Sequence, residues 1–433
     1  MKRLLSILFW SVLSAAFIGP GTVTVASSAG HRFGLDLLWA LTFSTLACVV
    51  LQEASARIAL GSGLDLGQAI RLRYQNSWTR ILVLPLIVVA VVVGCAAYQA
   101  GNILGGVAGA ELLVGAAGWQ VTLVMGALAF SLLWFGSIKW VARILGGVVA
   151  LMGAAFLATA CGLGPDVEGV LRGALLPRSP AGSGLLVLGL VGTTVVPYNL
   201  FLGSGLARGQ KLDELRFGLI IAIVLGGLVS MGVVVVGTSV IGEYSIPNLA
   251  AALSGRLGPW AGPFFGVGLF AAGLSSAITA PLAAAITARS LFRGPGAVRS
   301  DHRAPLYRAT WMLVLSTGVG FGIFGQKPVP VILVAQAFNG VLLPFVAIFL
   351  LILLNDRSVV GAAARNRIAG NLLLGLVVAV TLLLGLTNVL KAACNAFDYP
   401  LPSERTLLLA AAGLTLLAGL LLAPRLIRDG KAS

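Results

Sequence analysis

The sequence predicts an all-α integral membrane protein with about twelve membrane-spanning helices. Three observations lead to this prediction: 58% of the 433 residues are hydrophobic, only 10% are charged, and long apolar stretches recur along the whole chain. Soluble domains carry charge on roughly a quarter of their residues, whereas about 20 consecutive apolar residues suffice to cross the hydrocarbon core of a bilayer as a helix. A membrane therefore replaces water as the solvent for most of this chain.

The predicted spans divide the chain into three parts. Residues 1–163 hold five spans, residues 164–354 hold five more, and residues 355–433 hold two further helices and a short tail. An odd number of spans in the first part reverses the orientation of the second part. We therefore expect two halves related by an axis in the membrane plane, which is the 5+5 inverted repeat of many secondary transporters.

The positive charge of the chain follows this topology. Most of the 29 lysines and arginines fall in alternate loops, and their side of the membrane is predicted to be cytoplasmic by the positive-inside rule. Both termini are then cytoplasmic, in a multi-pass protein of the cell membrane. We expect anionic lipid headgroups, and no nucleic acid, to be the partners of the densest basic cluster, which contains Arg289, Arg293, Arg299, Arg303 and Arg308.

No pattern typical of an enzyme or of a cofactor site occurs in the sequence. It shows no acid–base pair, nucleophile elbow or phosphate-binding loop. The four cysteines lack metal-type spacing, and we interpret them as packing residues. We therefore expect neither catalysis nor a cofactor, and the sequence leaves the oligomeric state open.

Two predicted spans are interrupted at corresponding positions in the two halves. The first contains Gly19-Pro20-Gly21, and the sixth contains Thr-Thr-Val-Val-Pro-Tyr-Asn at residues 193–199. A proline inside a helix leaves backbone groups without intrahelical partners, and in a membrane such groups must lie in protein or line a polar cavity. Either break alone can be a simple proline kink, but the matched pair favours a transport site.

At these breaks the sequence resembles the natural resistance-associated macrophage protein (NRAMP) family, whose members are proton-coupled divalent-metal transporters with a LeuT-like fold. The family's first-helix Asp-Pro-Gly-Asn motif aligns with residues 19–22, and its sixth-helix motif Gly-Ala-x-x-Met-Pro-His-Asn-Leu-Tyr-Leu aligns with residues 192–202. Further similar segments are residues 51–57, 63–66, 275–279 and 343–345, together with Gln336. The resemblance implies a LeuT-like fold with broken first and sixth helices.

The chain departs from the family pattern at the residues that hold the metal in the family. The motif aspartate is replaced by Gly19, the asparagine by Thr22, the methionine by Val196, and the alanine whose carbonyl assists by Thr193. The positions associated with proton movement are also replaced, by Cys95 and Tyr98 in the third span and by Tyr198 and Gly203 in the sixth. We therefore expect neither the usual metal ligands nor the usual proton path.

What remains around the breaks is neutral and able to form hydrogen bonds. We predict a substrate-binding set consisting of Gly19, Thr22, Thr193, Thr194, Val196, Tyr198, Asn199, Gln336 and Asn339. Each threonine can instead bond to its own helix, and Asn199 can simply brace the break. Ser275, Ser276 and Thr279 offer hydroxyls for a possible sodium site of the kind that other LeuT-like transporters have.

The sequence thus predicts a secondary transporter that works by alternating access on a small solute or ion, without the family's manganese or iron site. One alternative is transport of a magnesium-like or hydrated cation through neutral oxygens. Another is a receptor or scaffold that keeps the fold but does not transport. Glu53 is the only acid placed inside a span, and we expect an ion pair with Arg57 on the same helix face; His31 is expected to be an interfacial side chain.

Overall fold

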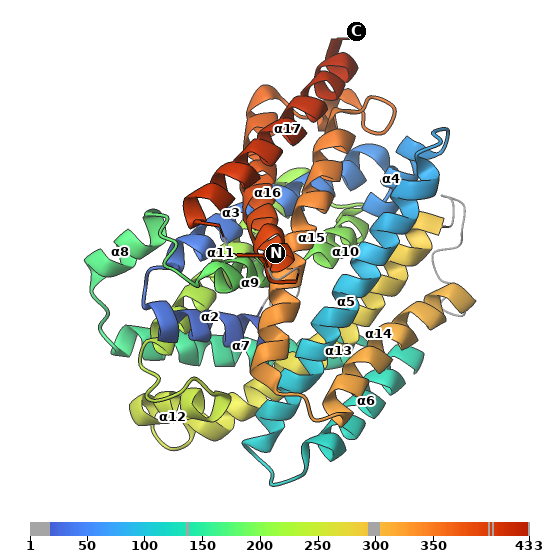
Figure 1. Ribbon diagram of the computed structural model, residues 1–433. Helices are drawn as coiled ribbons and strands as arrows, with labels where there is room; N and C mark the ends of the chain where they lie inside the picture. The colour runs from blue at the N-terminus through green and yellow to red at the C-terminus, as the bar shows by residue number, and fades with distance from the viewer. Residues whose placement is uncertain (1–17, 136–137, 293–303, 397–398, 401, 432–433) are drawn as a thin grey trace.

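The computed structural model describes residues 18–135, 138–292, 304–396, 399–400 and 402–431, and helices make up most of this part of the chain (Figure 1). No strand occurs among these residues, so the predicted all-α class is confirmed. The first half of the chain contains α2 (Pro20–Phe33), α3 (Leu38–Ser62), α4 (Leu66–Tyr74), α5 (Arg80–Glu111), α6 (Gly118–Phe135) and α7 (Ile138–Gly162). The second contains α8 (Val167–Leu175), α9 (Gly184–Thr194), α10 (Pro197–Ala207), α11 (Leu212–Gly237), α12 (Ile246–Leu257), α13 (Ala261–Phe292), α14 (Pro305–Ile323) and α15 (Pro328–Asn355). The chain then continues through η1 (Ala362–Ala364), α16 (Ile368–Ala396) and α17 (Glu404–Lys431).

Nine helical segments of the described residues are long and apolar enough to cross a membrane. They are α3, α5, α6, most of α7, the α9–α10 pair, α11, α13, α15 and α16. The three other predicted spans coincide with α2, α14 and α17, which are helical but fall outside this group. The beginning of the first predicted span, up to residue 17, lies outside the described residues.

Three short helices were not predicted. α4, α8 and α12 have 9, 9 and 12 residues, so a search for stretches of about 20 apolar residues passes over them. α4 is fixed by a capping box: the Asp65 carboxylate accepts a hydrogen bond from the Gln68 backbone N–H, and the Gln68 side chain accepts one from the Asp65 N–H. A search for caps as well as for apolar length would have found this helix.

Glycines allow the spanning helices to approach closely. A Cβ atom placed on Gly30 of α2 would lie 1.9 Å from the Val234 carbonyl oxygen of α11, and one on Gly109 of α5 would lie 2.7 Å from the Gly266 carbonyl oxygen of α13. Membrane helices associate through such close packing because lipid provides no hydrophobic force between them. The high glycine content therefore has a direct structural use at these two interfaces.

At one end of the molecule α4 joins the ends of α3 and α10. The Arg208 guanidinium, at the end of α10, lies 3.4 Å from an Asp65 carboxylate oxygen and donates a 2.5 Å hydrogen bond to the Gln68 side-chain oxygen. The Leu66 backbone N–H donates to the Ser204 hydroxyl of α10 at 2.9 Å. α4 also packs on α13, so contacts of α4 connect α3, α10 and α13 at this end of the helix bundle.

At the opposite end, the connection between α11 and α12 is bonded to α2. The Tyr244 hydroxyl donates to the Thr24 carbonyl oxygen at 3.2 Å and shares a 2.7 Å hydrogen bond with the Ser27 hydroxyl. The half-buried His31 ring lies 5.9 Å from the Tyr244 ring. α2 is buried from Pro20 to Gly30, and these contacts connect it to the segment between α11 and α12 at this end.

Glu53 forms a larger network than the sequence predicted. Its carboxylate lies 3.2 Å from Arg57 four residues later, which confirms the expected ion pair. It also accepts two hydrogen bonds, at 3.0 and 2.6 Å, from Arg216 of α11. Arg57 in turn donates to the Asn366 side chain, which precedes α16. One carboxylate thus links α3 to α11 and, through Arg57, to the C-terminal segment.

We expect Glu53→Gln to destabilise the protein by about 1–3 kcal/mol, because it leaves two partly buried guanidiniums without their shared anion. Glu168→Gln is the matched control, since Glu168 pairs with Arg172 at an exposed site where such pairs contribute less than about 1 kcal/mol. Thermal unfolding of the detergent-solubilised variants measures both. Equal midpoints for the two variants would contradict a structural role for the Glu53 network.

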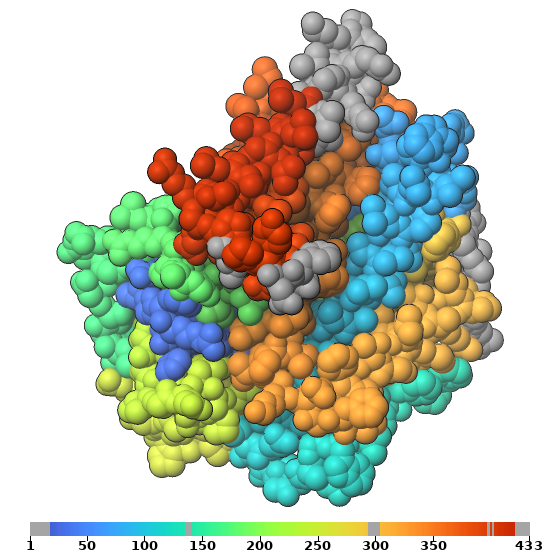
Figure 2. Space-filling model, viewed as in Figure 1, coloured from blue at the N-terminus to red at the C-terminus, as the bar shows by residue number. Residues whose placement is uncertain are grey.

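The C-terminal helices pack on the outside of the helix bundle. α16 contacts α15, and α17 contacts α16, and Figure 2 shows the red part of the C-terminal segment on the visible face of the molecule. Of the predicted basic cluster, Arg293, Arg299 and Arg303 lie outside the described residues. Arg289 stacks over the Tyr307 ring at 5.6 Å and Arg308 over the Trp134 ring at 4.3 Å. The lipid partners remain a prediction.

Candidate functional site

The break in the sixth span is two residues long. α9 ends at Thr194, α10 begins at Pro197, and Val196 between them has an extended backbone with φ −82° and ψ 121°. Proline at the first helical position fits because its missing N–H is not needed there. The predicted interruption at residues 193–199 is therefore present, and it ends one helix and starts another.

The break in the first span is visible from Gly19 onward. α2 begins at Pro20, and Gly19 before it is extended, with φ −96° and ψ 178°, and provides no side chain to cap the helix. The residues before Ile18 lie outside the described residues. α2 packs on α9, the first helix of the interrupted sixth span.

The two breaks meet through their threonines. The hydroxyls of Thr22 and Thr193 form a buried 2.8 Å hydrogen bond between residues that are 171 positions apart in the sequence. Thr194 differs from them because its hydroxyl donates to the Leu190 carbonyl of its own helix at 2.8 Å. The alternative of a local bond therefore applies to Thr194, whereas Thr22 and Thr193 bond to each other.

α15 adds a buried amide to this meeting point. Gln336 is fully buried, and a Cβ atom on Gly21 would lie only 2.3 Å from its side-chain nitrogen. Within the described residues, neither the nitrogen nor the oxygen of this amide has a hydrogen-bond partner. Asn339, one turn along the same helix, approaches Gly94 of α5, and its side-chain nitrogen is likewise buried without a partner.

Two tyrosines complete the centre from α5 and α10. The rings of Tyr98 and Tyr198 meet edge to face with their centroids 5.5 Å apart. A Cβ atom on Gly19 would lie 3.5 Å from the Tyr98 hydroxyl and 3.3 Å from the Ser276 hydroxyl. We call the residues named here at the two breaks, together with Asn199 of α10 and Asn339 of α15, the central cluster: Gly19, Thr22, Tyr98, Thr193, Tyr198, Asn199, Gln336 and Asn339.

Other predicted positions lie beside the central cluster or apart from it. Cys95 is buried one turn before Tyr98. Gly203 faces α3, since a Cβ atom on it would lie 2.5 Å from the Gln52 side-chain oxygen. Of the possible sodium ligands, Ser276 lies beside Gly19, whereas the Thr279 hydroxyl donates to carbonyls of its own helix, Ser275 at 3.1 Å and Ser276 at 3.4 Å. The sodium site therefore remains a prediction.

The central cluster consists of neutral groups. In the part of the chain that the structure describes, no three His, Cys, Asp or Glu side chains come together as a metal would require. The carboxylate of Glu53 is instead bound to Arg57 and Arg216. Hydroxyls and amides can orient a polar solute through hydrogen bonds, but they offer no anion to a dehydrated divalent cation.

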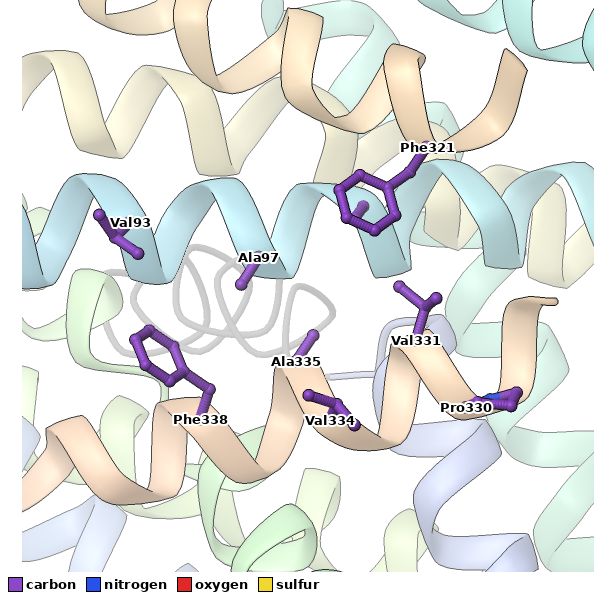
Figure 3. A pocket seen from close by; sticks show the side chains of 9 residues that line it. Val93, Ala97, Phe321, Pro330, Val331, Val334, Ala335 and Phe338 are labelled. Atoms are coloured by element: carbon purple, nitrogen blue, oxygen red, sulfur yellow. The ribbon is translucent and has the colours of Figure 1, made fainter. Parts of the chain in front are cut away.

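A separate apolar cavity of about 440 Å³ lies between α5, α14 and α15 (Figure 3). Phe321, Val331 and Phe338 are among its lining residues, and Val334 at its edge is 60% exposed. None of the residues of the central cluster lines it. The cavity opens toward the outer surface and is distinct from the meeting point of the two breaks.

Sequence reasoning missed several residues that connect distant helices at the two ends of the molecule and in the Glu53 network. Tyr244 and Arg216 bond to partners that lie 163 or more positions away in the sequence, so no local pattern marks them. Asp65 and Gln68 do carry a local signal, because their spacing matches a capping box.

Comparison with known proteins identifies the family. The family profile described as "Natural resistance-associated macrophage protein-like" matches residues 11–391. The divalent metal cation transporter MntH of Deinococcus radiodurans is 28% identical over 387 residues, which cover 85% of this chain and 86% of that protein. MntH of Granulibacter bethesdensis is 25% identical over 412 residues, covering 90% and 88%.

Solved structures agree on the fold. The manganese transporter of Eremococcus coleocola matches with a TM-score of 0.71 at 19% identity, covering 97% of this chain and 92% of that one. MHP1, a nucleobase-cation-symport-1 family transporter, matches with a TM-score of 0.53 at 17% identity, covering 98% and 95%. The predicted LeuT-like fold is therefore confirmed, while the domain boundaries at 163/164 and 354/355 remain predictions. The chain is a multi-pass membrane protein that belongs to the Nramp family of transporters.

Proposed function

We propose that this protein is a secondary transporter that moves a small polar solute other than Mn²⁺ or Fe²⁺ by alternating access. The observation that carries the proposal is the hydrogen bond between Thr22 and Thr193, which joins the two breaks at a point surrounded by buried neutral groups. The relatives are named divalent metal cation transporters. We therefore propose the same kind of activity, transport across a membrane, with a different substrate.

The chemistry of the central cluster supports a substrate other than a divalent metal ion. A divalent cation that leaves water near the middle of a bilayer needs several lone-pair donors and usually an anionic ligand. The positions that align with the family's ligands carry Gly19, Thr22, Thr193 and Val196. Of these side chains, only the two threonines offer oxygens, and those are already bonded to each other.

The polar contacts at the two ends of the molecule support alternating access. A carrier needs a barrier on each side of its site, and one barrier must open while the other remains closed. The Asp65–Arg208 contacts at the α4 end and the Tyr244 contacts at the α12 end can act as these two barriers. With the positive-inside rule, the α4 end faces the cytoplasm.

The proposal predicts that a variant with the family's metal ligands restored binds Mn²⁺, whereas the wild type does not. Calorimetry on the purified protein is expected to show no saturable Mn²⁺ binding in the wild type. The triple variant Gly19→Asp, Thr22→Asn, Val196→Met is expected to bind Mn²⁺ with a Kd below about 1 mM, which corresponds to more than about 4 kcal/mol. The control is the same triple variant with Asn at position 19, which has nearly the same shape but no charge.

Two other outcomes would replace this proposal. Saturable Mn²⁺ uptake by the wild type in proteoliposomes, lost in Thr22→Ala, would establish cation transport through neutral oxygens. Absence of uptake for every solute tested, with both ends inaccessible to thiol reagents, would establish a receptor or scaffold that has kept the fold.

A further inference from the structure

The apolar cavity between α5, α14 and α15 is a second place where a ligand fits (Figure 3). α14 and α15 both pack on α5 but scarcely contact each other, so a groove remains between them. Its volume of about 440 Å³ lies within the range of about 300–1,000 Å³ that is usual for ligand pockets. The groove is therefore large enough to hold a ligand of its own.

All of the described residues that line this cavity are apolar. Its deepest part is formed by small side chains, because Ala100 and Ala335 line it and are almost completely buried. Figure 3 shows Ala97 and Ala335 pointing toward each other across the space between α5 and α15. Such walls offer water no hydrogen bonds, and an empty cavity would leave their atoms without van der Waals partners. A hydrocarbon is therefore the occupant that fits.

The cavity extends along one leaflet of the membrane. On α15 it runs from Pro330 to Phe338, a rise of about 12 Å at about 1.5 Å per residue. One leaflet contributes roughly 15 Å to a hydrocarbon core that is about 30 Å thick. Phe338 lies between Gln336 and Asn339 of the central cluster, whereas Pro330 lies near the start of α15. The cavity therefore reaches from the middle of the membrane to one surface, which is the direction that a lipid chain takes.

The side of the cavity is open to the surroundings of the protein. Val334 lines it and is 60% exposed, and Phe321 of α14 is 40% exposed. Both residues belong to membrane-spanning parts of the chain, so the opening faces the lipid chains of the bilayer. An acyl chain can therefore enter sideways without crossing a polar surface.

A cationic side chain lies at the membrane-surface end of the cavity. Lys327 is exposed and directly precedes α15, one turn before Pro330. The positive-inside rule places this connection on the non-cytoplasmic side, opposite the α4 end. A chain that fills the cavity has its headgroup at this level, where the Lys327 ammonium attracts a phosphate. The charge at the surface thus complements the apolar cavity below it.

We propose that the cavity binds one acyl chain of an anionic phospholipid from the non-cytoplasmic leaflet, whose headgroup phosphate pairs with Lys327. This site lies on the opposite side of the membrane from the predicted basic cluster, and it does not depend on the proposed function. The bound chain packs on α5 and α15, which also carry Tyr98 and Gln336 of the central cluster. The lipid therefore helps to set the spacing of two helices that form the centre of the molecule.

The test is native mass spectrometry of the full-length protein in detergent, with lipids of equal chain length added in turn. The probes are dioleoyl-phosphatidylglycerol, which is anionic, and dioleoyl-phosphatidylcholine, which is zwitterionic. Ala97→Phe fills the cavity and is expected to retain one phosphatidylglycerol fewer than the wild type. Ala127→Phe adds the same ring at an exposed position of α6 outside the cavity and is expected to retain the wild-type number.

The headgroup is tested by changing an exposed side chain only. At the site that Ala97→Phe removes, the wild type is expected to bind phosphatidylglycerol about fivefold more tightly than phosphatidylcholine, because one surface cation contributes about that factor. Lys327→Gln is expected to abolish this preference. Arg256→Gln removes another exposed cation, at the end of α12, and is expected to leave the preference unchanged.

Three results would overturn the proposal. The first is equal retention of phosphatidylglycerol by Ala97→Phe and Ala127→Phe; if Ala97→Phe does not fold, Val331→Phe fills the same cavity and is used instead. The second is a wild type that retains both lipids equally, or a preference that survives in Lys327→Gln. The third is a dimer that holds no lipid and dissociates in Ala97→Phe, which would show that a second copy of the chain covers the cavity.

Discussion

Gly30→Ala is expected to lower the thermal unfolding midpoint, in contrast to a glycine-to-alanine change at an open helical position, and it can prevent folding altogether. The new Cβ atom would lie 1.9 Å from the Val234 carbonyl oxygen and 2.9 Å from its carbonyl carbon. Both atoms belong to the backbone of α11, so the contact is relieved only if α2 and α11 move apart. Overpacking of this kind costs typically 1–3 kcal/mol and occasionally more.

The matched control is Gly226→Ala on α11 itself, where a Cβ atom would meet nothing within 4 Å. Alanine at an open helical position is more favourable than glycine by roughly 0.5–1 kcal/mol, so this variant is expected to be unchanged or more stable. Fluorescence-detected thermal unfolding in detergent compares the two. If Gly30→Ala unfolds at the wild-type temperature, α2 and α11 are not packed as the structure has them.

Arg208→Ala is expected to open the α4 end of the molecule and to accelerate labelling of the buried Cys95 about tenfold or more. The substitution removes the ion pair with Asp65 and the hydrogen bond that the charged Arg208 guanidinium donates to the Gln68 amide oxygen. A hydrogen bond that involves a charged group contributes about 1.5–3 kcal/mol. A shift of about 1.4 kcal/mol is already a factor of ten in an equilibrium. The measurement is the rate of maleimide modification in a protein whose other three cysteines are replaced by serine.

The effect of Arg208→Ala is expected to depend on pH. Burial raises the pKa of the Asp65 carboxyl, while the Gln68 N–H and the Arg208 charge lower it. Because the folded-state pKa is above the ordinary value, the ionised carboxylate costs stability, and this cost decreases as the pH falls through the folded-state pKa. Arg208 offsets this cost only while Asp65 is charged, so the difference in labelling rate between the variant and the wild type is expected to become smaller in acid. The part that is due to the Gln68 hydrogen bond is expected to remain.

Arg172→Ala is the control for this experiment, since Arg172 is an exposed partner in a surface ion pair and its loss is expected to leave Cys95 protected. If Cys95 remains as slow to react in Arg208→Ala as in the wild type at neutral pH, the Asp65–Arg208 contact is not a barrier to the centre.

The features of the fold that could be predicted from the sequence are those determined by residues close together in the chain. Proline and glycine at the two breaks determine backbone geometry within a few residues, so the interruptions and their pairing could be predicted. Apolar length identified the spans for the same reason. The C-terminal end of α5 could not be predicted in this way, because the helix continues to Glu111, where small residues allow it to pack on α13.

The site was predictable as a set of positions but not as a set of contacts. The resemblance placed Thr22, Thr193 and Gln336 near the breaks, yet their chemical state depends on neighbours from distant helices. Thr22 and Thr193 could each have bonded locally, as Thr194 does. That Gln336 lies against Gly21 of α2 is recorded by no pattern within α15.

The separation of 171 residues between Thr22 and Thr193 also bears on biogenesis. During synthesis the ribosome delivers the first helices to the membrane well before the sixth exists, and domains fold largely in the order in which they emerge. Throughout that interval the Thr22 hydroxyl has no Thr193 to bond with, so a nascent chain released after five helices contains half of a recognition surface. The insertion machinery and the surrounding lipid must therefore tolerate a polar, glycine-rich first helix until its counterpart arrives.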